Sequence, residues 1–210
     1  VFSVLVIPAG EELCEISRSE NRKLWRRVEA GEITPHMLRT MRFEAFLEKA
    51  NVRTALTPGE LSRHYLRAFS EAGKLVEGAE ELLTFVKDLN HAKTAIATNG
   101  FGDTQRRRMA VTDIEKFFDE LFISDEMGLK KPDPAFFHTV LDTLGVPDAG
   151  RCVMVGDNLV SDIRGGREAG LITCWYNPAG VEAEEHAHHI DFEIRDLSRL
   201  EAILSQLMRE

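Results

Sequence analysis

Two short segments of this sequence contain residue types that could bind a phosphate group. Thr98, Asn99 and Gly100 follow the apolar run AKTAIA, where a hydroxyl group and successive backbone N–H groups could cradle a phosphate. Lys131 lies in GLKKPDP, whose prolines favour an extended backbone that would hold the ammonium group in place. Taken alone, the first segment could equally be a turn with a helix cap, and the second a solvated loop lysine.

A third segment, VMVGDNLVSDI, contains two carboxylates that could bind a magnesium ion. Asp157 follows three apolar residues and Gly156, and Asp162 falls at the start of the helix expected next. Two carboxylates that converge on one place repel each other unless a cation lies between them. Mg²⁺ typically takes one or two protein carboxylates together with substrate phosphate. The structural alternative makes Asp157 a turn former and Asp162 a helix-start residue that interacts with the helix dipole.

The elements that must position these residues alternate between short apolar runs and helices from about residue 76 onward. This alternation is typical of βαβ units on a parallel sheet that is buried on both faces. The carboxyl ends of the strands then share one edge, where ligands bind in open sheets. Thr98, Lys131 and Asp157 each follow a different predicted strand, so we expect them to meet. Together they would supply the parts needed for phosphoryl transfer.

The first third of the chain has a different pattern. From about residue 12 to residue 72, apolar residues recur at three- and four-residue spacing, which predicts a small helical bundle. Thr34-Pro35 and Thr57-Pro58 each indicate a helix N-cap followed by proline at the first helical position. The opening VFSVLVI is the one strand-like stretch of this region.

Composition narrows the choice of partners. The net charge of −9 disfavours nucleic acid and anionic membranes, although it leaves room for a small phosphorylated metabolite. The three cysteines show no CxxC spacing, so we expect a reduced, cytoplasmic protein. No apolar run approaches the roughly 20 residues that a membrane helix needs. We interpret the segment EEHAHH as a solvated loop and the arginines of QRRRM as an exposed helix face.

TNG, KPDPAFF and VGDNLVSDIRGGREAGL, in this order and spacing, resemble motifs two, three and four of the haloacid-dehalogenase (HAD) superfamily over about residues 76–178. The segment ENRKLWRRVEAGEITP resembles the helical cap of the branch that contains pyrimidine 5′-nucleotidases. The resemblance implies an α/β fold, with a Rossmann-like core of parallel sheet at 76–210 and a small all-helical cap at 1–75. The family's cap has four helices and follows the first strand. The implied activity is Mg²⁺-dependent hydrolysis of a phosphate monoester through a phosphoaspartate.

The resemblance also implies a role for each candidate residue. Thr98 would hydrogen-bond the phosphoryl group, and the next two residues would shape its loop, with Asn99 also near the phosphate. Lys131 would steady the phosphate and the nucleophile. Asp157 would bind Mg²⁺ directly, and Asp162 would support the metal site directly or through water.

Motif one of the family is missing from the sequence. The family uses DxDxT after its first strand, where one aspartate attacks phosphorus and the other protonates the leaving oxygen, and no DxDxT occurs here. Either the printed sequence begins after motif one, which the start at Val1 favours, or residues 1–7 are a core strand and PAGEEL replaces the motif. We favour the first explanation. Some segment must fill the strand position, because each unpaired backbone group costs about 1–3 kcal/mol.

Neither explanation lets the 210 residues alone carry out the chemistry. One hypothesis is therefore a phosphatase, in particular a 5′-nucleotidase, whose nucleophilic aspartate lies outside these residues. The alternative is a catalytically inactive relative that binds phosphate or metal. A phosphoacceptor receiver domain also uses aspartate, threonine and lysine on a parallel sheet. Such domains lack a helical cap and place their aspartates before the threonine, so this third possibility is distant.

Overall fold

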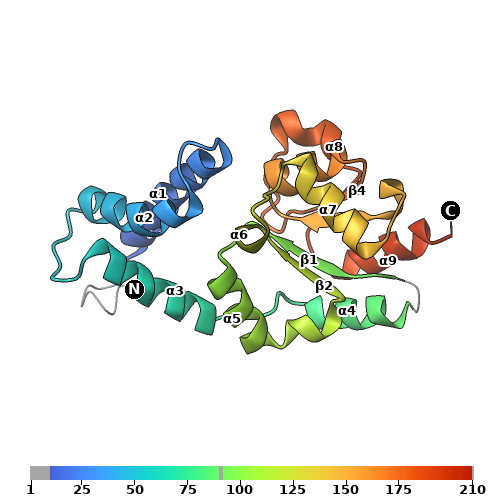
Figure 1. The fold of residues 1–210 in the computed structure, drawn as a ribbon, viewed down its shortest axis with the longest axis horizontal. Coiled ribbons are helices and arrows are strands. Elements are labelled where there is room, and N and C mark those ends of the chain that lie inside the picture. Colours follow the sequence, from blue (N-terminus) through green and yellow to red (C-terminus); the bar gives the residue numbers. More distant parts are fainter. Residues whose placement is uncertain (1–9, 90–91, 210) are drawn as a thin grey trace. The chain divides into compact units, whose positions relative to one another are not determined.

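The computed structural model describes residues 10–89 and 92–209. The chain forms two compact units, Val1–Gly73 and Lys74–Glu210, which are described separately below. Figure 1 shows the helices of the first unit in blue to teal and the α/β unit in green to red. The interpretation of residues 1–7 as a core strand falls outside the described residues.

The described part of the first unit contains three helices, where the resemblance implies four: α1 (Glu11–Glu29), α2 (Pro35–Lys49) and α3 (Pro58–Glu71). The two predicted caps are present. The hydroxyls of Thr34 and Thr57 accept backbone N–H groups at the starts of α2 and α3, and proline follows each of them. Apolar residues from the helices and their connections form a buried core of Leu24, Val28, Ile33, Leu38, Phe43, Phe46 and Leu61.

The described residues of the second unit form five short strands, and every pair of neighbouring strands runs parallel. The predicted α/β fold with parallel strands is therefore confirmed. One sheet has the order β1-β2 and the other the order β3-β4-β5, and among the described residues no backbone pairing joins β1 to β3. The strands are β1 (Ala95–Thr98), β2 (Glu120–Ile123), β3 (Val153–Gly156), β4 (Ile172–Tyr176) and β5 (Phe192–Ile194).

Helices connect these strands. The α-helices of this unit are α4 (Ala79–Asp88), α5 (Gly102–Thr112), α6 (Ser124–Met127), α7 (Pro134–Leu144), α8 (Gly165–Glu168) and α9 (Ser198–Leu207). Shorter helical turns are η1 (Ile114–Phe117), η2 (Ala149–Arg151), η3 (Leu159–Arg164) and η4 (Glu184–His189), of which η3 is a π-helix. Within the described residues no helix has both the length and the apolar character needed to cross a bilayer.

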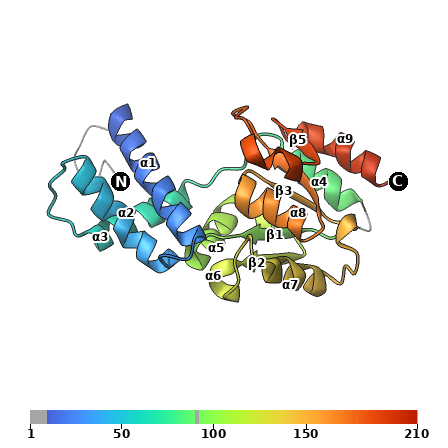
Figure 2. The ribbon, with the colours of Figure 1, turned by 90° about the horizontal axis from the view of Figure 1, so that it is seen from above.

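The strands are buried on both faces, which explains their apolar sequences. Along β3, Val153 and Val155 pack into a cluster with residues of α4 and α9, whereas Met154 packs into the cluster that contains Phe136 and Phe137 of α7. Figure 2 shows α4 and α9 on one side of the strands and α7 on the other. The polar side chains of the candidate site consequently lie at or beyond the strand ends, not along the strands.

Candidate active site

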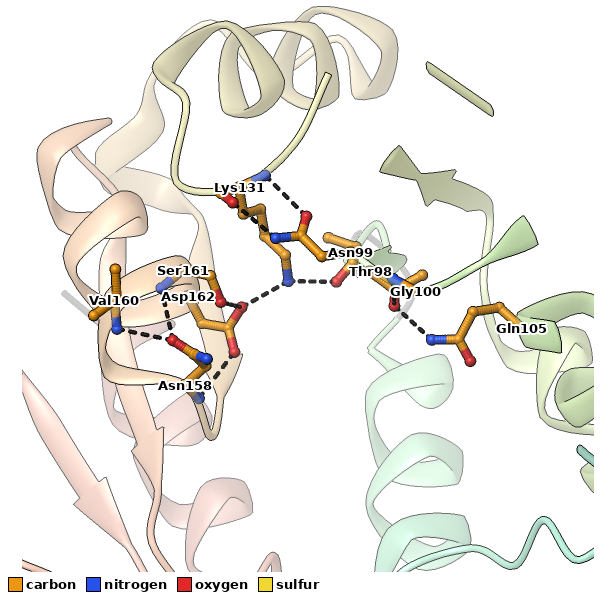
Figure 3. A network of polar contacts seen from close by, with 10 residues as sticks. Thr98, Asn99, Gly100, Gln105, Lys131, Asn158, Val160, Ser161 and Asp162 are labelled. Atoms are coloured by element: carbon orange, nitrogen blue, oxygen red, sulfur yellow. Dashed lines mark hydrogen bonds and ion pairs between the residues drawn. The ribbon is translucent and has the colours of Figure 1, made fainter. Parts of the chain in front are cut away.

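Lys131, in the loop between α6 and α7, forms a buried ion pair with Asp162 (Figure 3). Its Nζ lies 2.7 Å from Asp162 Oδ1 and donates a second hydrogen bond, of 2.6 Å, to the carbonyl oxygen of Ala97 in β1. The two charged side chains are only 6% and 8% exposed. An ammonium group has three N–H donors, so one donor remains for a further acceptor.

Asn99 holds the loop that carries Lys131. Its Nδ2 donates to the Lys131 carbonyl oxygen at 2.7 Å, and its Oδ1 accepts the Lys131 backbone N–H at 2.9 Å. These reciprocal bonds join the end of β1 to a residue 32 positions later in the chain. The side chain therefore positions the Lys131 backbone, a role that its place beside Thr98 in the sequence does not reveal.

Thr98 is the last residue of β1, and its hydroxyl oxygen accepts two hydrogen bonds from protein groups. Its Oγ1 accepts the backbone N–H of Gly100 at 3.1 Å and the side-chain Nε2 of Gln105 at 2.6 Å. Gln105 lies on α5, and sequence reasoning missed it because no pattern of residue types distinguishes it from an ordinary helical glutamine. Figure 3 shows it reaching back toward the end of the strand.

Asp162 lies in η3, directly behind the turn that follows β3. Besides Lys131, its Oδ1 accepts the Ser161 hydroxyl at 3.2 Å, and its Oδ2 accepts the Asn158 backbone N–H at 3.1 Å. Gly156 makes room for this carboxylate, since a Cβ on that glycine would lie 2.6 Å from Asp162 Cγ. Asp162 is 6% exposed, so its main role in this structure is to be the buried counter-charge of Lys131.

Asp157 is exposed at the carboxyl end of β3. Its backbone carbonyl accepts the indole N–H of Trp175 at 3.1 Å, which ties the turn to β4. Its carboxylate has no hydrogen-bond or ion-pair partner within the described residues, and it borders a pocket lined by Val76, Val155, Tyr176 and Leu197. Of the two predicted metal ligands, Asp157 is thus the one whose oxygens are open.

The carboxylates of the site are hard oxygen ligands, which suit magnesium. The described residues contain no group of three or more His, Cys, Asp or Glu side chains that could hold a metal ion, and this covers the histidines of η4. Mg²⁺ needs fewer protein ligands, because water and substrate phosphate complete its shell. An open carboxylate at Asp157, with the buried Asp162 carboxylate close behind it in the same turn, suits that ion.

Hydrogen bonds join Lys131 to Ala97, Asn99 and Asp162, whereas Thr98 bonds separately to Gly100 and Gln105 (Figure 3). Asp157 lies directly after β3. The bonds of Lys131 thus connect β1 and η3 to the loop between α6 and α7.

The sequence of the chain is similar to those of known proteins. Residues 7–170 match the haloacid dehalogenase-like hydrolase family. The chain is 40% identical over 165 residues to pyrimidine 5′-nucleotidase YjjG of Escherichia coli, covering 79% of this chain and 71% of that protein. It is 29% identical over 167 residues to pyrimidine 5′-nucleotidase PynA of Streptococcus pneumoniae, covering 80% and 69%.

The fold of the chain is also similar to that of a solved structure. The crystal structure of the putative HAD-hydrolase YfnB of Bacillus subtilis, bound to magnesium, superposes with a TM-score of 0.87 at 30% identity. The match covers 97% of this chain and 87% of that one. Because the family match covers most of the chain and a solved structure shares its fold, the chain belongs to the haloacid dehalogenase-like hydrolases, a family of hydrolytic enzymes.

Proposed function

We propose that this protein is a magnesium-dependent phosphatase that hydrolyses the monoester of a small phosphorylated metabolite. The observation that carries the proposal is the buried Lys131 ammonium, which bonds Asp162 and Ala97 and retains one donor. A buried ammonium whose other donors are satisfied offers a strong, charge-assisted hydrogen bond to a phosphoryl oxygen. The hydrolytic chemistry of the family supports the same conclusion.

Two of the relatives, YjjG and PynA, suggest the substrate class. YjjG and PynA are pyrimidine 5′-nucleotidases, so we propose a pyrimidine nucleoside 5′-monophosphate as the substrate. In this proposal Lys74–Glu210 holds the phosphate, and the helical unit, Val1–Gly73, corresponds to the family's cap.

The chain's own residues would bind and orient the phosphate. Lys131 and Thr98 donate to its oxygens, and Asn99 keeps the Lys131 loop in register. Asp157 would hold Mg²⁺, with Asp162 behind it directly or through water. The bound ion supplies positive charge that neutralises the phosphoryl oxygens. Because Lys131 is already neutralised by Asp162, its ammonium adds local donors without leaving an unpaired buried charge.

The attacking group would be an aspartate that these 210 residues do not contain in a DxDxT motif. We propose that it stands at the carboxyl end of a strand that pairs with both β1 and β3, which are not joined to each other in the described residues. Its carboxylate oxygen would form a bond to phosphorus as the ester oxygen leaves. A second acid would give that oxygen a proton, and water would then hydrolyse the phosphoaspartate.

The test begins with the coding DNA upstream of Val1. If it contains an in-frame DxDxT, we expect the longer protein to hydrolyse para-nitrophenyl phosphate only with Mg²⁺. We also expect the 210-residue chain to show no turnover. Asp157→Ala in the longer protein is expected to lower the rate by roughly 100-fold or more. Asp142→Ala, an exposed carboxylate of α7, is the matched control and should leave the rate unchanged.

Two results would contradict the proposal. Turnover that survives Asp157→Ala would remove the metal assignment, and turnover by the 210-residue chain would remove the external nucleophile. The second candidate function, an inactive phosphate- or metal-binding protein, is favoured by the missing DxDxT. It would be supported by a start codon at Val1 together with phosphate binding and no hydrolysis.

A further inference from the structure

The hydrogen bonds at Thr98 determine which way its hydroxyl proton can point. A threonine hydroxyl has one proton to donate and two lone pairs that accept. The Gly100 N–H and the Gln105 Nε2 donate to Thr98 Oγ1 at 3.1 and 2.6 Å, and together they occupy both lone pairs. Within the described residues the Thr98 hydroxyl donates to no other group, so its proton is left for a ligand.

Gln105 reaches Thr98 only because the residue between them is glycine. A Cβ on Gly100 would lie 2.7 Å from both Cγ and Cδ of Gln105, closer than carbon atoms approach each other. The glutamine side chain therefore crosses directly over Gly100 to reach the end of β1 (Figure 3). Because α5 begins at Gly102, Gln105 belongs to a helix that starts just after the loop, and its side chain turns back over that loop.

We propose that Gln105 is a positioning residue that commits the Thr98 hydroxyl to donate its proton to the phosphoryl group. This inference rests on the proposed function of the site. Without the amide of Gln105, one lone pair of Thr98 Oγ1 is free, and the hydroxyl can rotate to accept a hydrogen bond as readily as to donate one. An acceptor turned toward an anion weakens its binding, whereas a fixed donor strengthens it.

The experiment measures the affinity of the 210-residue chain for inorganic phosphate in the presence of Mg²⁺, by phosphorus NMR titration. Thr98→Val, which removes the hydroxyl, is expected to weaken binding by roughly 10- to 100-fold. Gln105→Met, which keeps the length of the side chain but has no N–H, is expected to weaken it by roughly 5- to 10-fold. Gln206→Met, on the exposed side of α9, is the control and should have no effect.

A double-mutant cycle separates positioning from a general structural effect. If Gln105 acts through the hydroxyl, Gln105→Met changes the affinity by less than about 2-fold in the Thr98→Val background and by its full factor in the Thr98→Ser background. In Gln105→Glu the new carboxylate would accept a hydrogen bond from the Thr98 hydroxyl and so compete with phosphate. This change should lower the phosphate affinity more with Thr98 present than in the Thr98→Val background. Circular dichroism verifies that each variant is folded.

The outcomes distinguish this inference from the function on which it rests. Phosphate binding that is absent, or unchanged by Thr98→Val, overturns the phosphate site and the inference together. Binding that is weakened by Thr98→Val and unaffected by Gln105→Met overturns the role of Gln105 alone. Equal losses from Gln105→Met in the Thr98→Val and Thr98→Ser backgrounds would show that the glutamine is only a packing residue, and this too overturns the inference.

Discussion

Lys131 and Asp162 form an ion pair that is almost completely removed from solvent. Burying two charges is expensive, and the pair is tolerated because each member has further partners: the Ala97 carbonyl for the lysine, and the Ser161 hydroxyl and Asn158 N–H for the aspartate. The lysine that is proposed to bind phosphate thus also holds the loop after β2 against the turn after β3.

This double role predicts a loss of stability when either partner is removed alone. Lys131→Met leaves the Asp162 carboxylate buried without its counter-charge, which should lower the free energy of unfolding by about 3–5 kcal/mol. The double variant Lys131→Met/Asp162→Leu should lose less than the sum of the two single changes. Urea unfolding followed by circular dichroism measures the four members of this cycle.

An exposed ion pair provides the comparison. Lys116 and Asp113 lie three residues apart, with their side chains 47% and 76% exposed. Lys116→Met should leave the unfolding free energy unchanged within error, because solvent screens such pairs. If Lys131→Met were as mild as Lys116→Met, the buried pair would not be the link between the two loops.

Of the strands in the described part of the chain, β4 is the one with a paired neighbour on each side, β3 and β5. Cys174 lies in the middle of it, with no exposed surface. Burial raises the pKa of the Cys174 thiol to about 11, because the thiolate loses its hydration in this environment. Since only the thiolate reacts readily, the thiol is unreactive at ordinary pH.

We therefore expect iodoacetamide at pH 8 to leave Cys174 unmodified in the folded protein. In urea the thiol regains an ordinary pKa of about 8.5 and should react within minutes. Mass spectrometry of peptides that contain Cys174 measures both states. Rapid modification of the folded protein would mean that β4 is not the protected centre of its sheet.

The described residues of the α/β unit form two parallel sheets, whereas a single continuous sheet would leave fewer edges without a partner strand. Among the described residues β1 pairs with β2 and β3 pairs with β4, while Lys131 and Asp162 bridge the carboxyl ends of β1 and β3. Strand edges without partners leave backbone groups that water or another strand must satisfy. A strand carrying the proposed aspartate would satisfy both edges and place its end beside Lys131.

Hydrogen exchange tests this view of the molecule. In the 210-residue chain, amides of β1 and β3 should exchange faster than those of β4, because in the part of the chain that the structure describes β4 is paired on both sides and they are not. In a longer protein that includes DxDxT, protection of residues 95–98 and 153–156 should rise toward that of residues 172–176. Equal protection of all three strands in the shorter chain would show that no strand is missing between β1 and β3.

The fold and much of the site follow from local sequence. The threonine caps before Pro35 and Pro58 depend on neighbouring residues only, and the ends of α7 are likewise defined locally, by Asp133, Pro134 and Gly145. The alternation of apolar strands with helices predicts parallel strands, since only βαβ connections bury both faces. That Thr98 and Asp157 stand at strand ends is visible in the sequence for the same reason, whereas α6 separates Lys131 from the end of β2.

Contacts between distant residues were decided by tertiary structure. The amide of Asn99 could have faced a ligand, but it bonds the Lys131 backbone, and Asp162 could have been an open metal ligand, but it is buried against the same lysine. Gln105 resembles any helical glutamine until α5 brings it over Gly100. Residue type and spacing determine which elements form and where they end, because those depend on neighbours in the chain. The hydrogen-bond partners of these side chains depend on how elements far apart in sequence pack together. Only the folded molecule determines those partners.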